Sequence, residues 1–88
     1  MGKGHSMKKH SLKTWLNPFA AQLKGLKNYE VRINDRDFAV GDFLILREWD
    51  EFTEQFTGEE LIREVTYMTY GGAFGMPKGL CIMSTREP

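Results

Sequence analysis

The sequence contains little cysteine, no long apolar run and no excess of charge, and each scarcity removes a class of protein. The single cysteine, Cys81, cannot form an internal disulfide, so a disulfide-stabilised secreted scaffold is excluded. No apolar run approaches the roughly 20 residues of a membrane span, and no secretory apolar segment is recognisable. A cytoplasmic protein without membrane contact, with Cys81 as a buried thiol, is therefore predicted.

Motifs for metals, cofactors and common catalytic centres are also missing. His10 is the sole histidine outside the first seven residues, so no His or Cys pair has the spacing of zinc ligands. The glycines of Gly71–Gly79 match neither phosphate-loop nor dinucleotide patterns. We expect no metal and no cofactor. One catalytic possibility remains: Lys27 acting as a base or nucleophile beside Glu30, which requires a neutral amine. An enzyme is the less favoured interpretation.

The length of 88 residues predicts one domain. Residues 1–7 differ from the rest and resemble a cloning leader, since they contain a second methionine, Met7, just before a basic stretch. A single domain is expected over residues 8–88.

Basic and acidic residues are unevenly divided along the chain, although the formal net charge is zero. Residues 1–36 hold eight basic against two acidic residues, whereas residues 37–88 hold four basic against ten acidic residues. Such asymmetry indicates contact with nucleic acid or another anion. Mutual neutralisation of the two parts in the folded domain is the alternative.

Residue patterns predict one short helix and about five strands. Asn17 and Pro18 are expected to start the helix, Phe19, Leu23 and Leu26 to form its apolar face, and Gly25 to end it. The remaining expected elements are extended or strand segments at 11–14, 29–33, 43–49, 61–70 and 80–85, with a hairpin loop at 51–58. A mainly β fold results: a small antiparallel barrel with one helix beside a cleft.

Charged and apolar residues alternate in the strand 29–33. Tyr29, Val31 and Ile33 are expected to form its buried stripe, which places Glu30 and Arg32 together on the opposite face. If that face meets solvent, its ion pairs contribute little stability. If it lines the groove beside the helix, its basic groups become phosphate or base donors.

Aromatic residues are expected mainly in the core. Those assigned to packing are Phe19, Phe43, Trp49 and Tyr67. Trp15 beside the helix start and Phe74 in the glycine-rich loop are the two rings that could instead be exposed and stack on a base.

Several motifs together resemble a known family. Gly25-x-Lys27-x-x-Glu30-x-Arg32, the Asn34–Phe38 run, and the Phe56-Thr57-Gly58 and Val40-Gly41-Asp42 motifs are similar to those of a small uncharacterised bacterial and phage family. That family belongs to the ASCH branch of the PUA-like superfamily, and the resemblance covers about 10–84.

The resemblance implies a PUA-like β-barrel whose cleft beside the first helix binds RNA. Some ASCH proteins are instead amidohydrolases of acylated cytidine, with a Lys, a Thr three residues later and a distant Glu. Lys27 matches that lysine here, but Glu30 occupies the Thr position, and the insertion that carries the distant acid is absent.

The sequence therefore predicts a domain that binds RNA or a nucleotide. The alternatives are a small amidohydrolase acting through Lys27 and Glu30, and an accessory domain that binds another protein. Glu30 would read a base edge or orient Arg32. The predicted binding residues are Lys13, Trp15, Lys27, Glu30, Arg32 and Arg36.

Overall fold

The computed structural model describes residues 7–88. The leader predicted at residues 1–7 thus falls, except for Met7, outside the described residues. The elements in chain order are β1 (Lys9–Trp15), α1 (Leu16–Leu23), β2 (Tyr29–Ile33), β3 (Phe43–Asp50), β4 (Gln55–Tyr70), the 3₁₀ turn η1 (Ala73–Gly75) and β5 (Leu80–Arg86).

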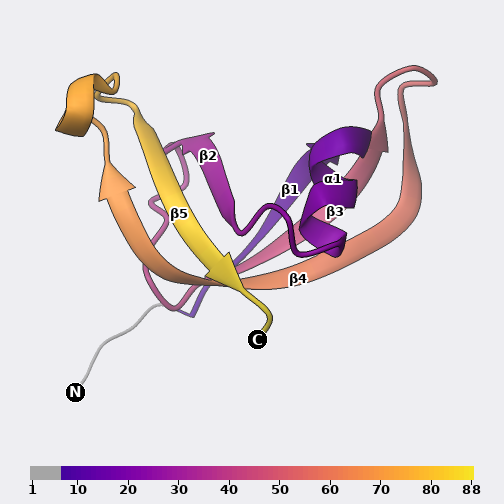
Figure 1. The fold of residues 1–88 in the computed structure, drawn as a ribbon, viewed down its shortest axis with the longest axis horizontal. Helices are drawn as coiled ribbons and strands as arrows, with labels where there is room; N and C mark the ends of the chain where they lie inside the picture. The colour runs from indigo at the N-terminus through magenta and orange to yellow at the C-terminus, as the bar shows by residue number, and fades with distance from the viewer. Residues whose placement is uncertain (1–6) are drawn as a thin grey trace.

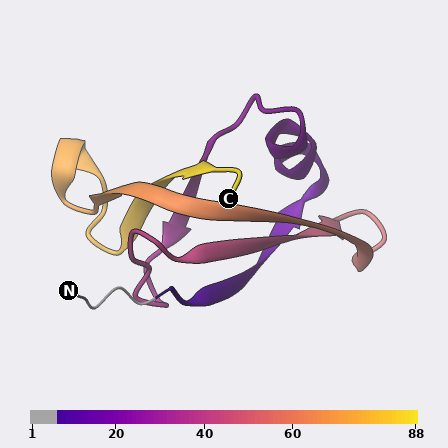
Figure 2. The same ribbon diagram turned by 90° about the horizontal axis from the view of Figure 1, so that it is seen from below.

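Five strands form one curled sheet in the order β1-β3-β4-β5-β2 (Figure 1). The sheet bends into a half-barrel, and α1 lies with the chain leading to β2 on one side of β3 and β4 (Figure 2). The predicted small mainly β fold with one short helix is confirmed. One pairing departs from the antiparallel expectation, because β1 runs parallel to β3. The chain reaches β3 by way of α1 and β2, and such a crossover permits parallel pairing.

The long central strand β4 joins the β1-β3 part of the sheet to the β5-β2 part. Its first part pairs with β3 and its second part with β5, both antiparallel. The turn between β3 and β4 is shorter than the predicted loop at 51–58, because Phe56, Thr57 and Gly58 already belong to β4. At the other end Gly71 closes the loop to β5: a Cβ there would lie 2.3 Å from the Pro77 carbonyl oxygen.

The helix has the predicted length but a different start and a different buried face. Trp15 occupies the N-cap position, not Asn17, and Gly25 follows the helix with a φ of +75°. Phe19 is buried, whereas Leu23 and Leu26 are exposed, so the predicted apolar face was wrong. The helix lies against β1 and β3. Its buried residues are Phe19 and Gln22, which are three positions apart and therefore share one helical face.

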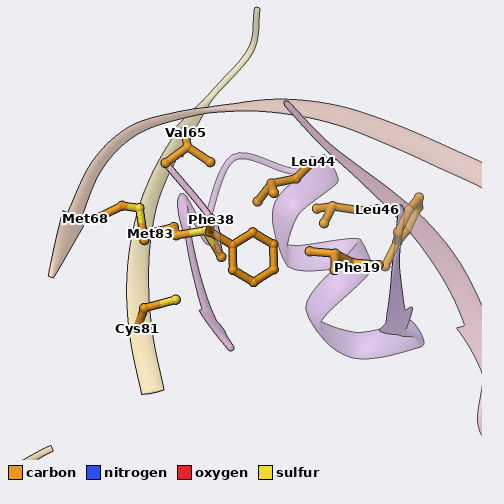
Figure 3. Packing of buried hydrophobic residues seen from close by; sticks show 9 residues of the cluster. Phe19, Phe38, Leu44, Leu46, Val65, Met68, Cys81 and Met83 are labelled. Carbon is orange, nitrogen blue, oxygen red and sulfur yellow. The ribbon is translucent and has the colours of Figure 1, made fainter. Parts of the chain in front are cut away.

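The core lies inside the half-barrel, where side chains from the sheet, α1 and the segment before β3 point toward one another (Figure 3). Its members are Leu12, Phe19, Phe38, Leu44, Leu46, Val65, Met68, Cys81 and Met83. The buried position predicted for Cys81 is confirmed, and burial raises the pKa of its thiol.

The core position predicted for Tyr67 is wrong, because a β-bulge shifts the alternation of inward and outward side chains along β4. Val65 pairs with Thr85, but Tyr67 already pairs with Ser84, so Thr66 is an extra residue. After the bulge Met68 returns to the interior and Tyr67 faces solvent. Phe43 and Trp49 are half-buried.

No helix among residues 7–88 has the length and apolar character needed to cross a membrane.

Candidate functional site

Strand β2 turns its charged face inward and its apolar face outward, the reverse of the predicted orientation. Tyr29, Val31 and Ile33 are 46–64% exposed, so the predicted buried stripe was wrong. Glu30 is only 2% exposed. Alternation determines which residues share a face but not which face is buried, and here hydrogen bonds offset the cost of burying the carboxylate.

The Glu30 carboxylate accepts hydrogen bonds from three side chains around it. Its Oε2 accepts from Lys27 Nζ at 2.7 Å and from Gln22 Nε2 at 2.9 Å. Its Oε1 lies 3.0 Å from Arg32 Nε and 2.9 Å from Arg32 Nη2. Three hydrogen bonds thus fill three of the roughly four lone-pair sites of this carboxylate, and the Arg32 Nη2 contact is an ion pair. We call Gln22, Lys27, Glu30 and Arg32 the Glu30 cluster. Within it Glu30 orients Arg32, and both of its oxygens already accept hydrogen bonds.

Arginine side chains bridge the opening of the half-barrel, where the two edge strands β1 and β2 face each other. Arg32 Nη2 donates to the Lys13 carbonyl oxygen at 3.1 Å. Arg36 Nη1 donates to the Ser11 carbonyl oxygen at 2.6 Å. These bonds satisfy edge-strand carbonyls that no neighbouring strand reaches. Arg32 and Arg36 therefore hold β1 in place as well as carrying charge.

A pocket of about 260 Å³, which we call the cationic pocket, opens between α1, β1 and β2 beside the Glu30 cluster. Its lining contains three cations and one carboxylate, a net formal charge of +2. Trp15 stands at its edge, 55% exposed. The lining residues are Lys13, Thr14, Trp15, Pro18, Lys27, Glu30, Val31 and Arg32.

Five of the six residues predicted as binding residues meet in this pocket. Arg36 does not; it lines an adjoining pocket of about 350 Å³ that shares Arg32 and Val31 with the first. Lys13 extends over the ring of Trp49, with Nζ 3.9 Å from the ring centroid. Phe74 is almost fully exposed, as considered from the sequence, but it lines neither pocket.

Sequence reasoning missed two polar residues of the site. Gln22 is fully buried, and its amide also donates to the Tyr29 carbonyl oxygen at 3.0 Å. Thr14 is buried, with Oγ1 3.4 Å from Arg32 Nη2. The position of Gln22, three residues after Phe19, was the available signal, since that spacing places both on one helical face.

A second buried carboxylate lies outside the pocket. Asp42 is fully buried, and its Oδ2 lies 2.8 Å from His10 Nε2. The two oxygens also accept backbone N–H groups, Oδ1 from Lys8 at 3.1 Å and Oδ2 from Ala39 at 3.0 Å. The His10 ring packs edge-on against Phe38, with centroids 4.6 Å apart. This pair joins the start of β1 to the segment before β3.

Among residues 7–88 no three His, Cys, Asp or Glu side chains gather in a way that could hold a metal ion. The prediction that the protein uses no metal or cofactor stays a prediction.

The fold and the site together define a small half-barrel domain with a cationic pocket where its two sheet edges meet. The family model of a domain of unknown function, DUF3850, matches residues 9–85, so the chain belongs to that family. No curated protein matches the chain.

Proposed function

We propose that this domain binds RNA or a nucleotide in the cationic pocket, as an ASCH-type member of the PUA-like superfamily. The observation that carries the proposal is the joining of Lys13, Lys27 and Arg32 with an exposed tryptophan in one pocket. Phosphate oxygens are recognised by such donors, and bases stack on exposed aromatic rings. The proposal includes a cytoplasmic location, which a single buried thiol fits.

The geometry supports binding more than amide hydrolysis. Lys27 Nζ lies 2.7 Å from a carboxylate oxygen of Glu30. That contact occupies the amine that a nucleophilic or basic lysine would have to direct at the substrate. Both oxygens of Glu30 in turn already accept hydrogen bonds from side chains. Acylated nucleosides incubated with the protein should therefore yield no deacylated product.

One observation favours the alternative of a protein partner. The outer face of β2 exposes Tyr29, Val31 and Ile33 beside the half-buried Leu80 and Ile82 of β5. Exposed apolar patches of this kind occur at protein interfaces. A partner that is captured by the protein and remains bound after nuclease treatment would support this second function.

Fluorescence anisotropy with a labelled single-stranded RNA tests the main proposal. Affinity should fall as salt rises, because phosphate contacts release counterions. Lys27→Met should weaken binding about tenfold and reduce the salt slope, since one cation near a phosphate is removed. Lys78→Met, which removes an exposed charge from the glycine-rich loop, is the matched control and should bind like the native chain.

Two results would overturn the proposal. The first is RNA and nucleotide binding that shows no salt dependence. The second is a Lys27→Met variant whose affinity equals that of Lys78→Met. Circular dichroism of each variant verifies that the fold is intact.

A further inference from the structure

The side chains of the cationic pocket offer mainly hydrogen-bond donors, because both oxygens of its carboxylate already accept hydrogen bonds from residues of the described chain. Lys27 Nζ uses one of its three N–H groups on Glu30. Arg32 directs Nε and Nη2 toward protein acceptors, while Nη1 has no acceptor among residues 7–88. Both oxygens of Glu30 are occupied, and the Thr14 hydroxyl donates to the Leu12 carbonyl oxygen. A ligand that fits this lining presents mainly acceptors.

The lining of the pocket carries more formal positive charge than one phosphodiester neutralises. The pocket has a net formal charge of +2, and the side chains of Lys27 and Arg32 remain 20% and 26% exposed. A phosphodiester within an RNA chain carries one negative charge. A phosphomonoester carries between about 1.5 and 2 negative charges at pH 7 and has three acceptor oxygens. The charge and the donors therefore match a terminal phosphate better than an internal one.

The size of the pocket and the position of Trp15 limit the group that is attached to the phosphate. About 260 Å³ lies just below the range of about 300–1,000 Å³ that is usual for pockets of small-molecule ligands. The Trp15 ring, exposed beside Pro18, provides one face on which one base can stack. Glu30 contributes little to recognition of the base edge, since three of its roughly four lone-pair sites already accept hydrogen bonds. One nucleotide, read by its phosphate more than by its base, fits these features.

We propose that the cationic pocket is selective for a phosphomonoester carried by a nucleotide, in the form of a mononucleotide or of the phosphorylated end of an RNA strand. This inference rests on the proposed function and specifies the ligand of the same pocket. Lys27 and Arg32 bind the phosphate, Trp15 stacks on the base, and Glu30 and Gln22 are positioning residues that hold the two cations.

Calorimetric titration of the full chain tests the selectivity with a nucleoside 5′-monophosphate, its methyl phosphodiester and the nucleoside without phosphate. The monophosphate should bind about tenfold more tightly than the methyl ester, because it adds one charge facing partly exposed cations. Its affinity should fall between pH 7.5 and pH 5, as the second phosphate ionisation near pH 6 is reversed. The affinity of the methyl ester should change much less. RNA with a 5′-phosphate should exceed 5′-hydroxyl RNA by a similar factor if the strand end is the source of the phosphate.

Two variants test recognition of the base and recognition of the phosphate separately. Trp15→Leu should lower the affinity for the monophosphate to that for inorganic phosphate, while Lys27→Met should remove the preference over the methyl ester. Lys78→Met should retain both properties. Equal binding of monophosphate and methyl ester overturns the selectivity and leaves RNA binding standing. Equal binding of phosphorylated and unphosphorylated RNA excludes the strand end as the source of the phosphate. Absence of binding by every nucleotide and RNA overturns both proposals.

Discussion

Two buried carboxylates, Glu30 and Asp42, are satisfied in different ways, and the difference separates the functional part of this domain from its structural part. Asp42 binds backbone N–H groups and the ring of His10. Among residues 7–88 the groups that bind Glu30 are side chains, and two of them are cations that reach solvent. Backbone donors fix a segment of chain in place, whereas flexible cations gathered around a carboxylate remain available to a ligand.

The comparison extends to the surroundings of each carboxylate. Asp42 lies between the start of β1 and the segment leading to β3, and its partner His10 packs against Phe38 of the core. Glu30 lies on edge strand β2, beside the pocket that Trp15 borders. Burial alone therefore does not identify a functional carboxylate. The identity of the donors, and whether they also reach a pocket, gives a better indication.

Asp42→Asn should produce the largest loss of stability. The amide keeps one acceptor oxygen but directs an NH₂ group at donors that are buried and cannot turn to water. We expect a loss of about 3 kcal/mol in the free energy of unfolding, measured by urea denaturation. Asp37→Asn, an exposed carboxylate with a positive φ that asparagine tolerates, is the control and should change stability by less than about 0.5 kcal/mol. Similar values for both variants would contradict a structural role of Asp42.

Glu30→Gln should cost less, about 2 kcal/mol, because Lys27 and Arg32 can turn toward water when the carboxylate is lost. The surface variant Glu60→Gln, which disturbs an exposed pair with Arg47, should cost under about 1 kcal/mol. The measurement is again urea denaturation. A loss at Glu30 equal to or greater than that at Asp42 would show that the Glu30 cluster is as enclosed as the structural pair.

Arg63→Met should cost about 1–2 kcal/mol and should also weaken nucleotide binding. Arg63 Nη2 donates to the Gln22 carbonyl oxygen at 3.1 Å, in the last turn of α1, where a cation stabilises the helix end. Its loss should loosen Gln22 and, through it, Glu30. Arg86→Met, which removes an exposed pair with Glu64, is the control. Thermal unfolding and nucleotide titration check the two effects, and unchanged nucleotide affinity would separate the helix end from the site.

The smallest expected change in stability comes from the thiol of Cys81. This residue of β5 lies opposite Arg32, a member of the Glu30 cluster, in the pairing of β5 with β2. Because burial raises the pKa of this thiol, the folded chain retains a proton that the unfolded chain releases above roughly pH 8.5. Stability should therefore fall as the pH rises beyond that value. Cys81→Ala removes this contribution, so its stability should fall less steeply with pH. Identical slopes for the two proteins would mean that the thiol is accessible to water when folded.

Much of the site could be predicted because its residues are close in sequence. Lys27, Glu30 and Arg32 lie within six positions, and their spacing places the last two on one face of a strand in any fold. Gln22 and Thr14 come from α1 and β1, so their contacts depend on how those elements pack. The pairing of His10 with Asp42 joins positions 32 residues apart, and no local pattern indicates it.

The sequence by itself determined one small mainly β domain, its helix and five strands, the buried cysteine and most of the pocket's residues. These follow from local spacing, turn residues and composition. The tertiary structure decided which face of β2 is buried, where the bulge at Thr66 turns Tyr67 outward, and which carboxylate adjoins a pocket. The physical reason is that an alternation of charged and apolar residues along a strand is compatible with burial of either face. The donors placed around it by the tertiary structure, Gln22 of α1 and Lys27 of the loop that follows, make burial of Glu30 more favourable than burial of Val31.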